Sequence, residues 1–215
     1  MTTWQQQADV LAGRAVAAGR PAAWFEELYS AGEAGEHDLP WDRSEPSPLV
    51  SAWDAVQQPP HGGRRAVVVG AGLGADARLL LAGGWQVTAF DISPTAVRLA
   101  ADRSPGVDIR VADLFALPAE LVGAFDLVLE VFTVQALPRT ERAGATAAVR
   151  SLLAPGGRLL VIQRVWDDEN DTSGPPWPLS AADIDAFADG DVTLEQQQTV
   201  DTAEGPYWRV QFRRA

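Results

Sequence analysis

Three glycines and one aspartate are the residues of this chain whose types and spacing are most able to do specific chemistry. Gly70, Gly72 and Gly74 follow an apolar, strand-like run and open a helical pattern. A glycine turn leaves its backbone open to a ligand, because no Cβ stands in the way. Asp91 ends the next strand-like segment, residues 86–91, where a carboxylate can accept hydrogen bonds from both hydroxyls of a ribose. The pattern predicts a site for a nucleoside-containing cofactor.

The glycine turn alone does not identify the cofactor. Its sequence GAGLGA fits both the GxGxxA pattern of dinucleotide folds and the GxGxG pattern of S-adenosylmethionine sites. Asp113, at the end of the third strand-like run, could accept the amino group of an adenine, or could be a plain turn residue. Asp76 lies in the first helical turn after the glycines, where an acid complements the helix dipole. It could also hold an amino group of the cofactor. The glycines themselves could serve only strand–helix packing.

Composition excludes several kinds of chemistry. The net charge of −12 argues against nucleic acid and acidic membrane surfaces as partners. The chain has no lysine, which excludes Schiff-base chemistry and a P-loop lysine, and no cysteine, which excludes disulfides and thiolate metal sites. With two histidines, a histidine-rich metal site is disfavoured. No 18-residue apolar run or signal-like N-terminus is present, and we expect a cytoplasmic protein, monomeric or homodimeric.

Strand and helix patterns alternate after residue 64. The predicted strands are 65–70, 86–91, 108–112, 125–130 and 157–163, and the predicted helices are 75–83, 94–103 and 140–153. This alternation predicts a doubly wound parallel sheet with right-handed crossovers. Two last strand-like runs, 192–200 and 207–213, predict an antiparallel hairpin around a Gly205-Pro206 turn.

A mostly helical segment, residues 4–57, precedes this alternation and is broken by a loop at 35–40. Residues 58–63 read as a linker. We therefore expect residues 1–60 to form an N-terminal helical cap that leads into the active site. Residues 61–215 are expected to form the cofactor-binding domain.

In their order, these motifs resemble class I S-adenosylmethionine-dependent methyltransferases over about residues 64–165 and the terminal hairpin. The resemblance implies a Rossmann-like fold with a seven-stranded, mostly parallel sheet, an antiparallel C-terminal hairpin and an N-terminal helical cap. It implies S-adenosylmethionine as the cofactor, with the glycine turn at its methionine end, Asp91 at its ribose and Asp113 at its adenine. Further cofactor contacts are implied from Ile92, Leu114, Phe115 and Glu130.

Flanking segments resemble those of the thiopurine, thiol and halide methyltransferase group. They are the aromatic-rich stretch 24–50, the segment LEVFTVQALP at 129–138, and GPPWPL at 174–179. Where that group often has a glycine after a Trp-Asp pair, this chain has Ser44-Glu45. The resemblance implies Trp41 as a wall of the cofactor site. It implies a substrate pocket formed by Trp24, Tyr29, Phe132, Gln135 and Trp177.

A soft nucleophile suits such a site, because a thiol with a pKa of about 8.5 is already a few per cent ionised at neutral pH. An alcohol or phenol acceptor would need a general base, for which His37 and Glu130 are the candidates. Each also has a structural interpretation, His37 as an exposed loop residue and Glu130 as the cap of the following turn. The sequence therefore favours methyl transfer to a small molecule, most of all a thiol.

Three other functions stay open: an oxygen or nitrogen methyltransferase of a small metabolite, a cofactor-binding module without catalysis, and a nicotinamide oxidoreductase. The last is disfavoured, since no second nucleotide-binding half or catalytic lysine, tyrosine or histidine is evident. The acidic run at 167–171 could attract a metal, but is interpreted as a solvated loop, and no metal site is predicted.

Overall fold

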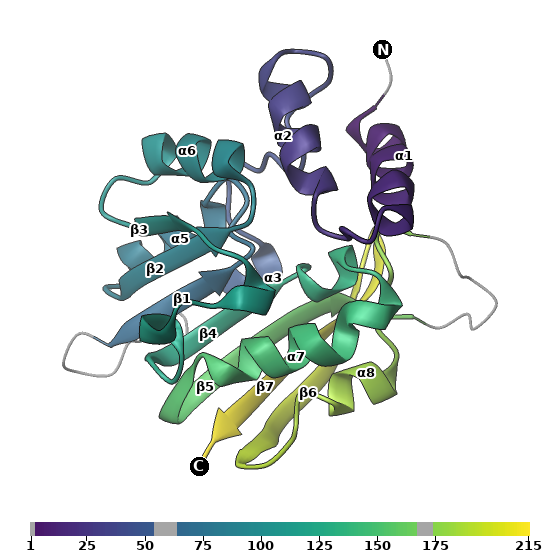
Figure 1. Ribbon diagram of the computed structural model, residues 1–215. Coiled ribbons are helices and arrows are strands. Elements are labelled where there is room, and N and C mark those ends of the chain that lie inside the picture. The colour runs from purple at the N-terminus through teal and green to yellow at the C-terminus, as the bar shows by residue number, and fades with distance from the viewer. Residues whose placement is uncertain (1–2, 54–63, 167–173) are drawn as a thin grey trace.

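A seven-stranded sheet forms the centre of the molecule (Figure 1). The computed structural model describes residues 3–53, 64–166 and 174–215. Its strand order is β3-β2-β1-β4-β5-β7-β6, parallel except for β7, which is antiparallel to both β5 and β6. The strands are β1 (Arg65–Val69), β2 (Gln86–Asp91), β3 (Asp108–Val111), β4 (Phe125–Val131), β5 (Leu153–Arg164), β6 (Val192–Thr202) and β7 (Gly205–Arg214). The predicted fold class, a Rossmann-like methyltransferase sheet with a terminal hairpin, is confirmed.

Helices cover both faces of the sheet, as apolar central strands require. On one face, α7 (Arg142–Ser151) and α8 (Ala181–Asp185) join a core that contains Val67 and Val128. On the other, α3 (Pro48–Ser51) and α5 (Ala75–Ala82) join a core that contains Val68 and Leu129. Alternate residues of β1 and β4 therefore serve two cores. Helix α6 (Pro94–Arg103) contacts β2 and β3 and begins at Ser93, whose hydroxyl caps its first turn.

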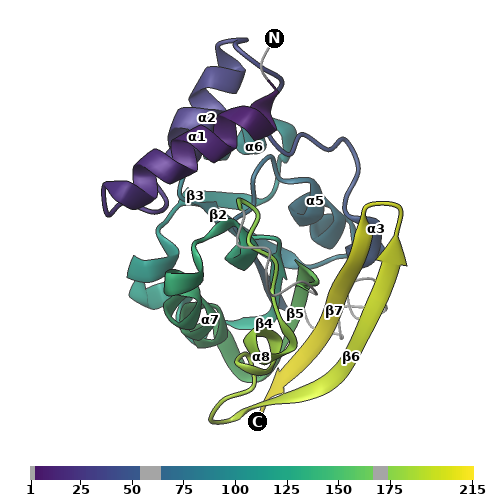
Figure 2. The same ribbon diagram turned by 90° about the vertical axis from the view of Figure 1, so that its right-hand side faces the viewer.

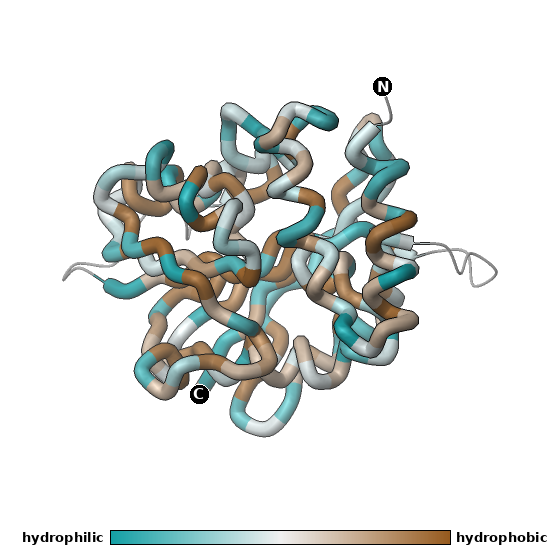
Figure 3. Tube along the Cα trace, turned by 45° about the horizontal axis from the view of Figure 1, so that its top comes forward, coloured by the Kyte–Doolittle hydropathy of each residue, from teal (hydrophilic) through white to brown (hydrophobic). Residues whose placement is uncertain are grey.

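Two helices form a cap above the rest of the molecule, α1 (Trp4–Ala17) and α2 (Trp24–Glu33) (Figure 2). They pack through a small cluster that includes Leu11, Trp24 and Leu28. Hydrophobic and hydrophilic residues alternate along α1, as expected of a helix that buries one side (Figure 3). The predicted helical character of this segment is therefore confirmed. Within the described ranges, no helix combines the length and apolar character that crossing a membrane requires.

The structure differs from the sequence prediction at a few boundaries. The strand expected at 157–163 begins at Leu153, because the segment around Gly156, with φ +74°, continues as an irregular strand beside β4. The turn expected at Gly205-Pro206 precedes these residues, which already belong to β7. The linker 58–63, the boundary between residues 60 and 61 and the acidic run 167–171 lie outside the described residues.

Candidate active site

A cavity of about 800 Å³ lies where the carboxyl ends of the parallel strands meet the cap. This is where the strand order reverses between β1 and β4, the usual ligand site of open α/β sheets. Its volume falls within the range of small-molecule sites. The lining includes Trp4, Phe25, Tyr29, Trp41 and Arg43; Gly70, Gly72 and Asp76; Asp91 and Ile92; Asp113, Leu114 and Phe115; Phe132, Thr133 and Gln135; and Arg164, Pro175, Pro176, Glu204 and Tyr207.

The glycine turn connects β1 to α5 with three residues of positive φ: Gly70 at +60°, Gly72 at +51° and Gly74 at +82°. Packing explains two of them. A Cβ at Gly70 would lie 2.7 Å from Cγ2 of Thr133, and one at Gly74 would lie 2.7 Å from Oγ of Ser104. Gly70 and Gly72 also line the cavity. Packing and an open backbone thus both require glycine here.

Asp91 lies at the end of β2 with only 7% of its surface exposed. Its Oδ2 accepts the N–H of Gly72 at 2.9 Å, and its Oδ1 accepts the N–H of Ser93 at 3.0 Å. Burial raises the pKa of this carboxyl, although these two N–H groups oppose the shift. A carboxylate offers about four lone-pair positions, so Asp91 keeps acceptor capacity toward the cavity.

Asp113 caps a short 3₁₀ turn after β3, since its Oδ1 accepts the N–H of Phe115 at 2.8 Å. The turn interpretation of this residue is therefore present in the structure. Its neighbours Leu114 and Phe115 line the same part of the cavity, and Phe115 is 42% exposed. Asp113 is thus a turn residue that also faces the candidate site.

Asp76 anchors the segment that follows the cap. Its Oδ1 accepts the N–H of Ser47 at 2.8 Å, and its Oδ2 pairs with Arg43 at 3.1 Å. The side chain is buried and lines the cavity. Its observed partners belong to the protein, so the structure gives Asp76 a role in fixing the segment around Ser47.

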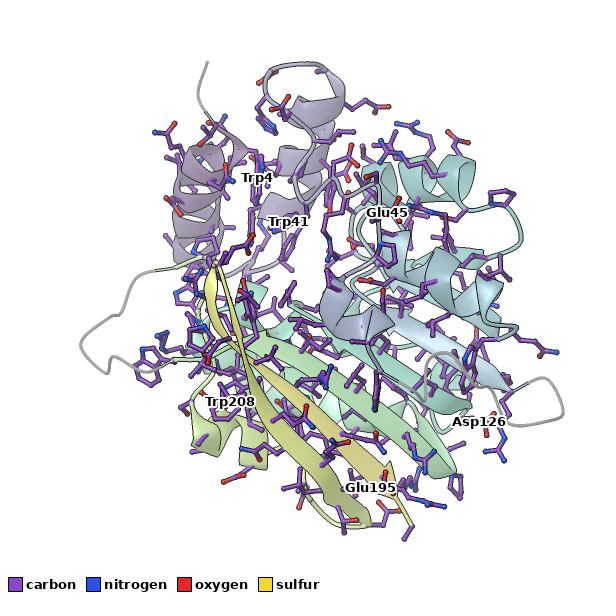
Figure 4. The ribbon with its side chains drawn as sticks, turned by 180° about the vertical axis from the view of Figure 1, so that it is seen from behind. Trp4, Trp41, Glu45, Asp126, Glu195 and Trp208 are labelled. Atoms are coloured by element: carbon purple, nitrogen blue, oxygen red, sulfur yellow. The ribbon has the colours of Figure 1, made fainter. Side chains whose placement is uncertain are left out.

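Two aromatic residues of the lining have a left-handed backbone conformation that side chains rarely adopt: Trp41 with φ +49° and Phe132 with φ +64°. Such strain is typical of ligand sites, where the surroundings over-determine it. The ring of Trp41 lies 4.9 Å from that of Trp4 and 6.0 Å from that of Tyr29, so these rings share one wall (Figure 4). The ring of Phe132 lies 5.5 Å from that of Tyr207.

Besides Gly74, whose position faces Ser104 and Ala100 instead, four residues predicted for the site lie outside the cavity lining. Trp24 is fully buried inside the cap, stacked on Phe25 at 4.0 Å, because its helix turns that face toward α1. Trp177 packs on Gly174 and on the cap cluster, and its neighbours Pro175 and Pro176 face the cavity instead.

His37 is the third. The prediction of an exposed loop residue is wrong, since His37 is only 8% exposed and its Nδ1 lies 2.7 Å from the carbonyl oxygen of Asp38.

Glu130 is the fourth, and it lies beneath the site rather than in it. Its Oε1 accepts the N–H groups of Thr133 at 2.8 Å and Val134 at 2.9 Å, and its Oε2 accepts from the side-chain amide of Gln163. Burial raises the pKa of Glu130 to about 7. Glu130 therefore caps the turn that follows β4, which is the structural interpretation of this residue given by the sequence.

Sequence reasoning missed several lining residues, among them Trp4, Arg164, Glu204 and Tyr207. Trp4 begins α1, Arg164 ends β5, and Glu204 and Tyr207 belong to the β6–β7 hairpin. The only signal in the sequence was the predicted hairpin itself, because nothing local shows that its turn reaches the strand ends where the cavity lies.

Comparison with known proteins places this site in a family. A family model described as thiopurine S-methyltransferase matches residues 32–211. Thiopurine S-methyltransferase of Aliivibrio fischeri (strain MJ11) is 32% identical over 94 residues, which are 44% of this chain and 42% of that protein. That of Vibrio atlanticus (strain LGP32) is 30% identical over 96 residues, again 44% and 42%. The match thus spans less than half the length of these curated relatives.

Solved structures agree on the fold. A protein studied for the conversion of a disulfide bond into a thioacetal group during echinomycin biosynthesis has a TM-score of 0.71 and 23% identity, over 88% of this chain and 91% of that one. The N-methyltransferase NodS from Bradyrhizobium japonicum WM9, solved with S-adenosyl-L-homocysteine, has a TM-score of 0.68 and 19% identity over 86% and 97%. The resemblance seen in the sequence is confirmed: the chain belongs to the thiopurine S-methyltransferase family, a family of S-adenosylmethionine-dependent methyltransferases.

Proposed function

We propose that this protein transfers the methyl group of S-adenosylmethionine to a small molecule, with a thiol or another soft nucleophile as the favoured acceptor. The observation that carries the proposal is the division of one cavity of about 800 Å³. The glycine turn, Asp91 and Asp113 line it from the side of β1, β2 and β3. Phe132, Gln135, Pro175, Pro176 and the β6–β7 hairpin line it from the side of β4, β5 and β7.

The acidic end suits the cofactor. Asp91 would accept hydrogen bonds from the ribose, and Asp113 would accept one from the adenine, with Ile92, Leu114 and Phe115 beside the base. The open backbone around Gly70 and Gly72 would contact the methionine end, and Asp76 would be the acid nearest its amino group. Trp41 would form a wall of the same site. Each of these roles is part of the proposal.

The other end suits an uncharged or aromatic acceptor body. Phe132, Pro175, Pro176 and Tyr207 present apolar surface there. Aromatic faces near a sulfonium would stabilise its positive charge by about 0.5–2 kcal/mol each. Alignment of donor and acceptor in a site without water contributes roughly 7–11 kcal/mol in well-oriented systems.

The chemistry favours an acceptor that needs no strong base. His37 and Glu130, the two candidates for a general base, lie outside the lining of the cavity. A thiol loses its proton readily near neutral pH, whereas an alcohol does not. Transfer to oxygen or nitrogen of a small metabolite is the second candidate, and a binding module without catalysis is the third.

A product assay tests the proposal. The protein is incubated with S-adenosylmethionine and, in turn, an aromatic thiol, an aliphatic thiol, a phenol and an amine. We expect S-adenosylhomocysteine and the methyl thioether to accumulate together, and both to form more slowly in the Asp91→Ala variant when S-adenosylmethionine is limiting. Methylation of only the phenol or amine would overturn the thiol preference, and binding of S-adenosylhomocysteine without turnover would favour the non-catalytic module.

A further inference from the structure

The side-chain amide of Gln135 has a fixed orientation in the acceptor end of the cavity. Its Oε1 accepts the backbone N–H of Arg164 at 2.6 Å. Its backbone N–H donates to the side chain of Gln163 at 3.2 Å, and its carbonyl oxygen accepts the N–H of Trp177 at 2.7 Å. The backbone N–H of Arg164 can only donate to the amide oxygen, so the amide nitrogen Nε2 is the side-chain atom that remains as a donor. Among the described residues it has no hydrogen-bond partner, and it is not sealed from the cavity.

The residue whose backbone meets this amide is itself a cation. Arg164 lines the cavity, and the Nη2 of its guanidinium donates to the carbonyl oxygen of Glu204 at 2.9 Å. It forms no ion pair within the described part of the chain. Arg43, the other cation of the lining, is paired with Asp76 at 3.1 Å. A guanidinium has five N–H donors, so most of those of Arg164 stay available.

None of the acidic residues that line the cavity forms an ion pair with Arg164 in the described structure. Asp76, Asp91 and Asp113 belong to the cofactor end. Glu204 lies near Arg164, but its carboxylate is turned to the hydroxyl of Tyr207 at 3.0 Å and forms no ion pair with the guanidinium in the described structure. Among the described residues, the acceptor end therefore combines a positive charge that has no ion-pair partner with an amide donor, in a protein whose net charge is −12.

We propose that Gln135 and Arg164 bind the methyl acceptor as an anion, so that the protein takes a thiol as its thiolate and discriminates against a neutral amine of the same shape. This inference rests on the proposed function. Nε2–H and guanidinium donors stabilise the charged form of the bound thiol and so lower its pKa. The thiol proton leaves to water. The thiolate sulfur then forms a bond to the methyl carbon while the bond from that carbon to the sulfonium breaks, its electron pair staying on the cofactor sulfur. The negatively charged thiolate and the positively charged sulfonium thus give two neutral thioethers, the methylated acceptor and S-adenosylhomocysteine.

The test measures the ionisation of a bound thiol directly. The complex of the protein with S-adenosylhomocysteine is titrated with 2-phenylethanethiol across a pH series, and the ultraviolet absorbance of the thiolate is followed. We expect the midpoint to fall below that of the free thiol. The shift should shrink in Gln135→Leu and Arg164→Gln. In turnover, the KM for the thiol should rise roughly tenfold to a hundredfold in these variants, the loss expected for hydrogen bonds to a charged group. The KM for S-adenosylmethionine should stay unchanged.

Controls separate a local effect from a general one. Arg158→Gln removes a cation from the middle of the same strand, where it pairs with Glu195 outside the cavity lining, and should leave the thiol midpoint unchanged. Gln135→Glu keeps the side-chain length but replaces the donor by a carboxylate, and should raise the midpoint. Aniline, which is uncharged at neutral pH, should be a poorer acceptor than thiophenol in the wild-type protein, and the difference should narrow in Gln135→Leu and Arg164→Gln.

The outcomes distinguish this inference from the proposed function. Failure of the wild-type protein to bind S-adenosylhomocysteine in calorimetry would overturn the proposed function. Binding of S-adenosylhomocysteine together with the same thiol midpoint in the wild type, Gln135→Leu and Arg164→Gln would overturn the inference alone. Equal methylation of the amine and the thiol would also overturn it.

Discussion

Asp91 is the single residue on which the candidate cofactor site depends most. Two backbone N–H groups hold its carboxylate at the end of β2, and burial raises its pKa. Such a group costs free energy to bury, and a fold retains it where it meets a ligand or holds a turn. Asp91 holds the glycine turn through the N–H of Gly72, and it also lines the cavity, where a ligand would meet it.

We predict that Asp91→Ala weakens binding of S-adenosylhomocysteine by roughly tenfold to a hundredfold, because a hydrogen bond to a charged group is worth about 1.5–3 kcal/mol. Calorimetry measures the affinity, and thermal unfolding shows whether the turn survives. Asp126→Ala is the matched control, because Asp126 lies near the start of β4, at the end of the strands away from the cavity (Figure 4). An affinity equal to that of the wild type would remove Asp91 from the site.

Glu130 gives a prediction about pH. Burial raises its pKa from 4.5 to about 7, so the folded protein keeps a proton that the unfolded chain loses near pH 4.5. The folded state binds more protons in this window, and the free energy of unfolding must fall as pH rises from about 4.5 to about 7. The slope for one such group approaches about 1.4 kcal/mol per pH unit.

Urea unfolding at several pH values between 5 and 7 measures this slope. We expect a shallower decline in Glu130→Gln than in the wild type, since the amide does not titrate. Other groups titrate alike in both proteins, so the difference belongs to Glu130. Parallel curves would contradict the account.

At the scale of elements, the glycine turn and the segment after β4 form one unit. Thr133 donates its hydroxyl proton to the carbonyl oxygen of Val69 at 2.9 Å, and a Cβ at Gly70 would collide with it. The glycine turn and the segment that carries Phe132 and Gln135 therefore cannot move independently.

We predict that Gly70→Ala destabilises the protein more than Gly123→Ala does. Both glycines have a positive φ, +60° and +66°, but a Cβ at Gly123 meets nothing within 4 Å. Gly123→Ala thus measures the backbone strain alone, about 1–2 kcal/mol. Equal losses in chemical denaturation would show that Thr133 moves aside at no cost.

Glu26 of α2 connects the cap to the start of α6. Its carboxylate accepts the hydroxyl of Ser93 at 2.6 Å and both the N–H and the hydroxyl of Thr95, at 3.1 and 2.8 Å. Burial alone would raise its pKa, but these hydrogen bonds lower it. The stability that they contribute is therefore present above the unfolded pKa, near 4.5, and is lost as pH falls through the folded value.

We predict that Glu26→Ala speeds amide hydrogen exchange across residues 24–33 while the central strands stay protected, since local opening needs only the cap contacts to break. Glu27→Ala is the matched control, because Glu27 lies in the same helical turn but is exposed. Faster exchange in both variants would assign the effect to the helix dipole instead of the contacts with α6.

The sequence predicted the elements and the cofactor end better than the acceptor end, for a physical reason. Glycine turns and the acids that follow strands are set by local geometry, and Gly70, Asp91 and Asp113 line the cavity as expected. Glu204 reaches the site only because β7 pairs antiparallel with β5, a contact between distant segments. Trp24 was predicted for the substrate pocket but lies in the core of the cap, because helical spacing alone does not reveal which face of α2 packs against α1.

At the scale of the whole molecule, the cavity exists only because cap and sheet are assembled together. Cap residues such as Tyr29 and Trp41 form one side, and the strand ends form the other. We retain as a proposal the division into a cap of residues 1–60 and a domain of residues 61–215. Val50 of α3 packs in the core beneath the sheet, so the first segment is not structurally independent of the second.

Calorimetric titration of the wild-type protein with S-adenosylhomocysteine, beside NADH as the competing ligand, tests the central claim most directly. The account predicts micromolar binding of S-adenosylhomocysteine (about −8 kcal/mol) and none of NADH. Binding of NADH alone, or of neither ligand, would contradict it.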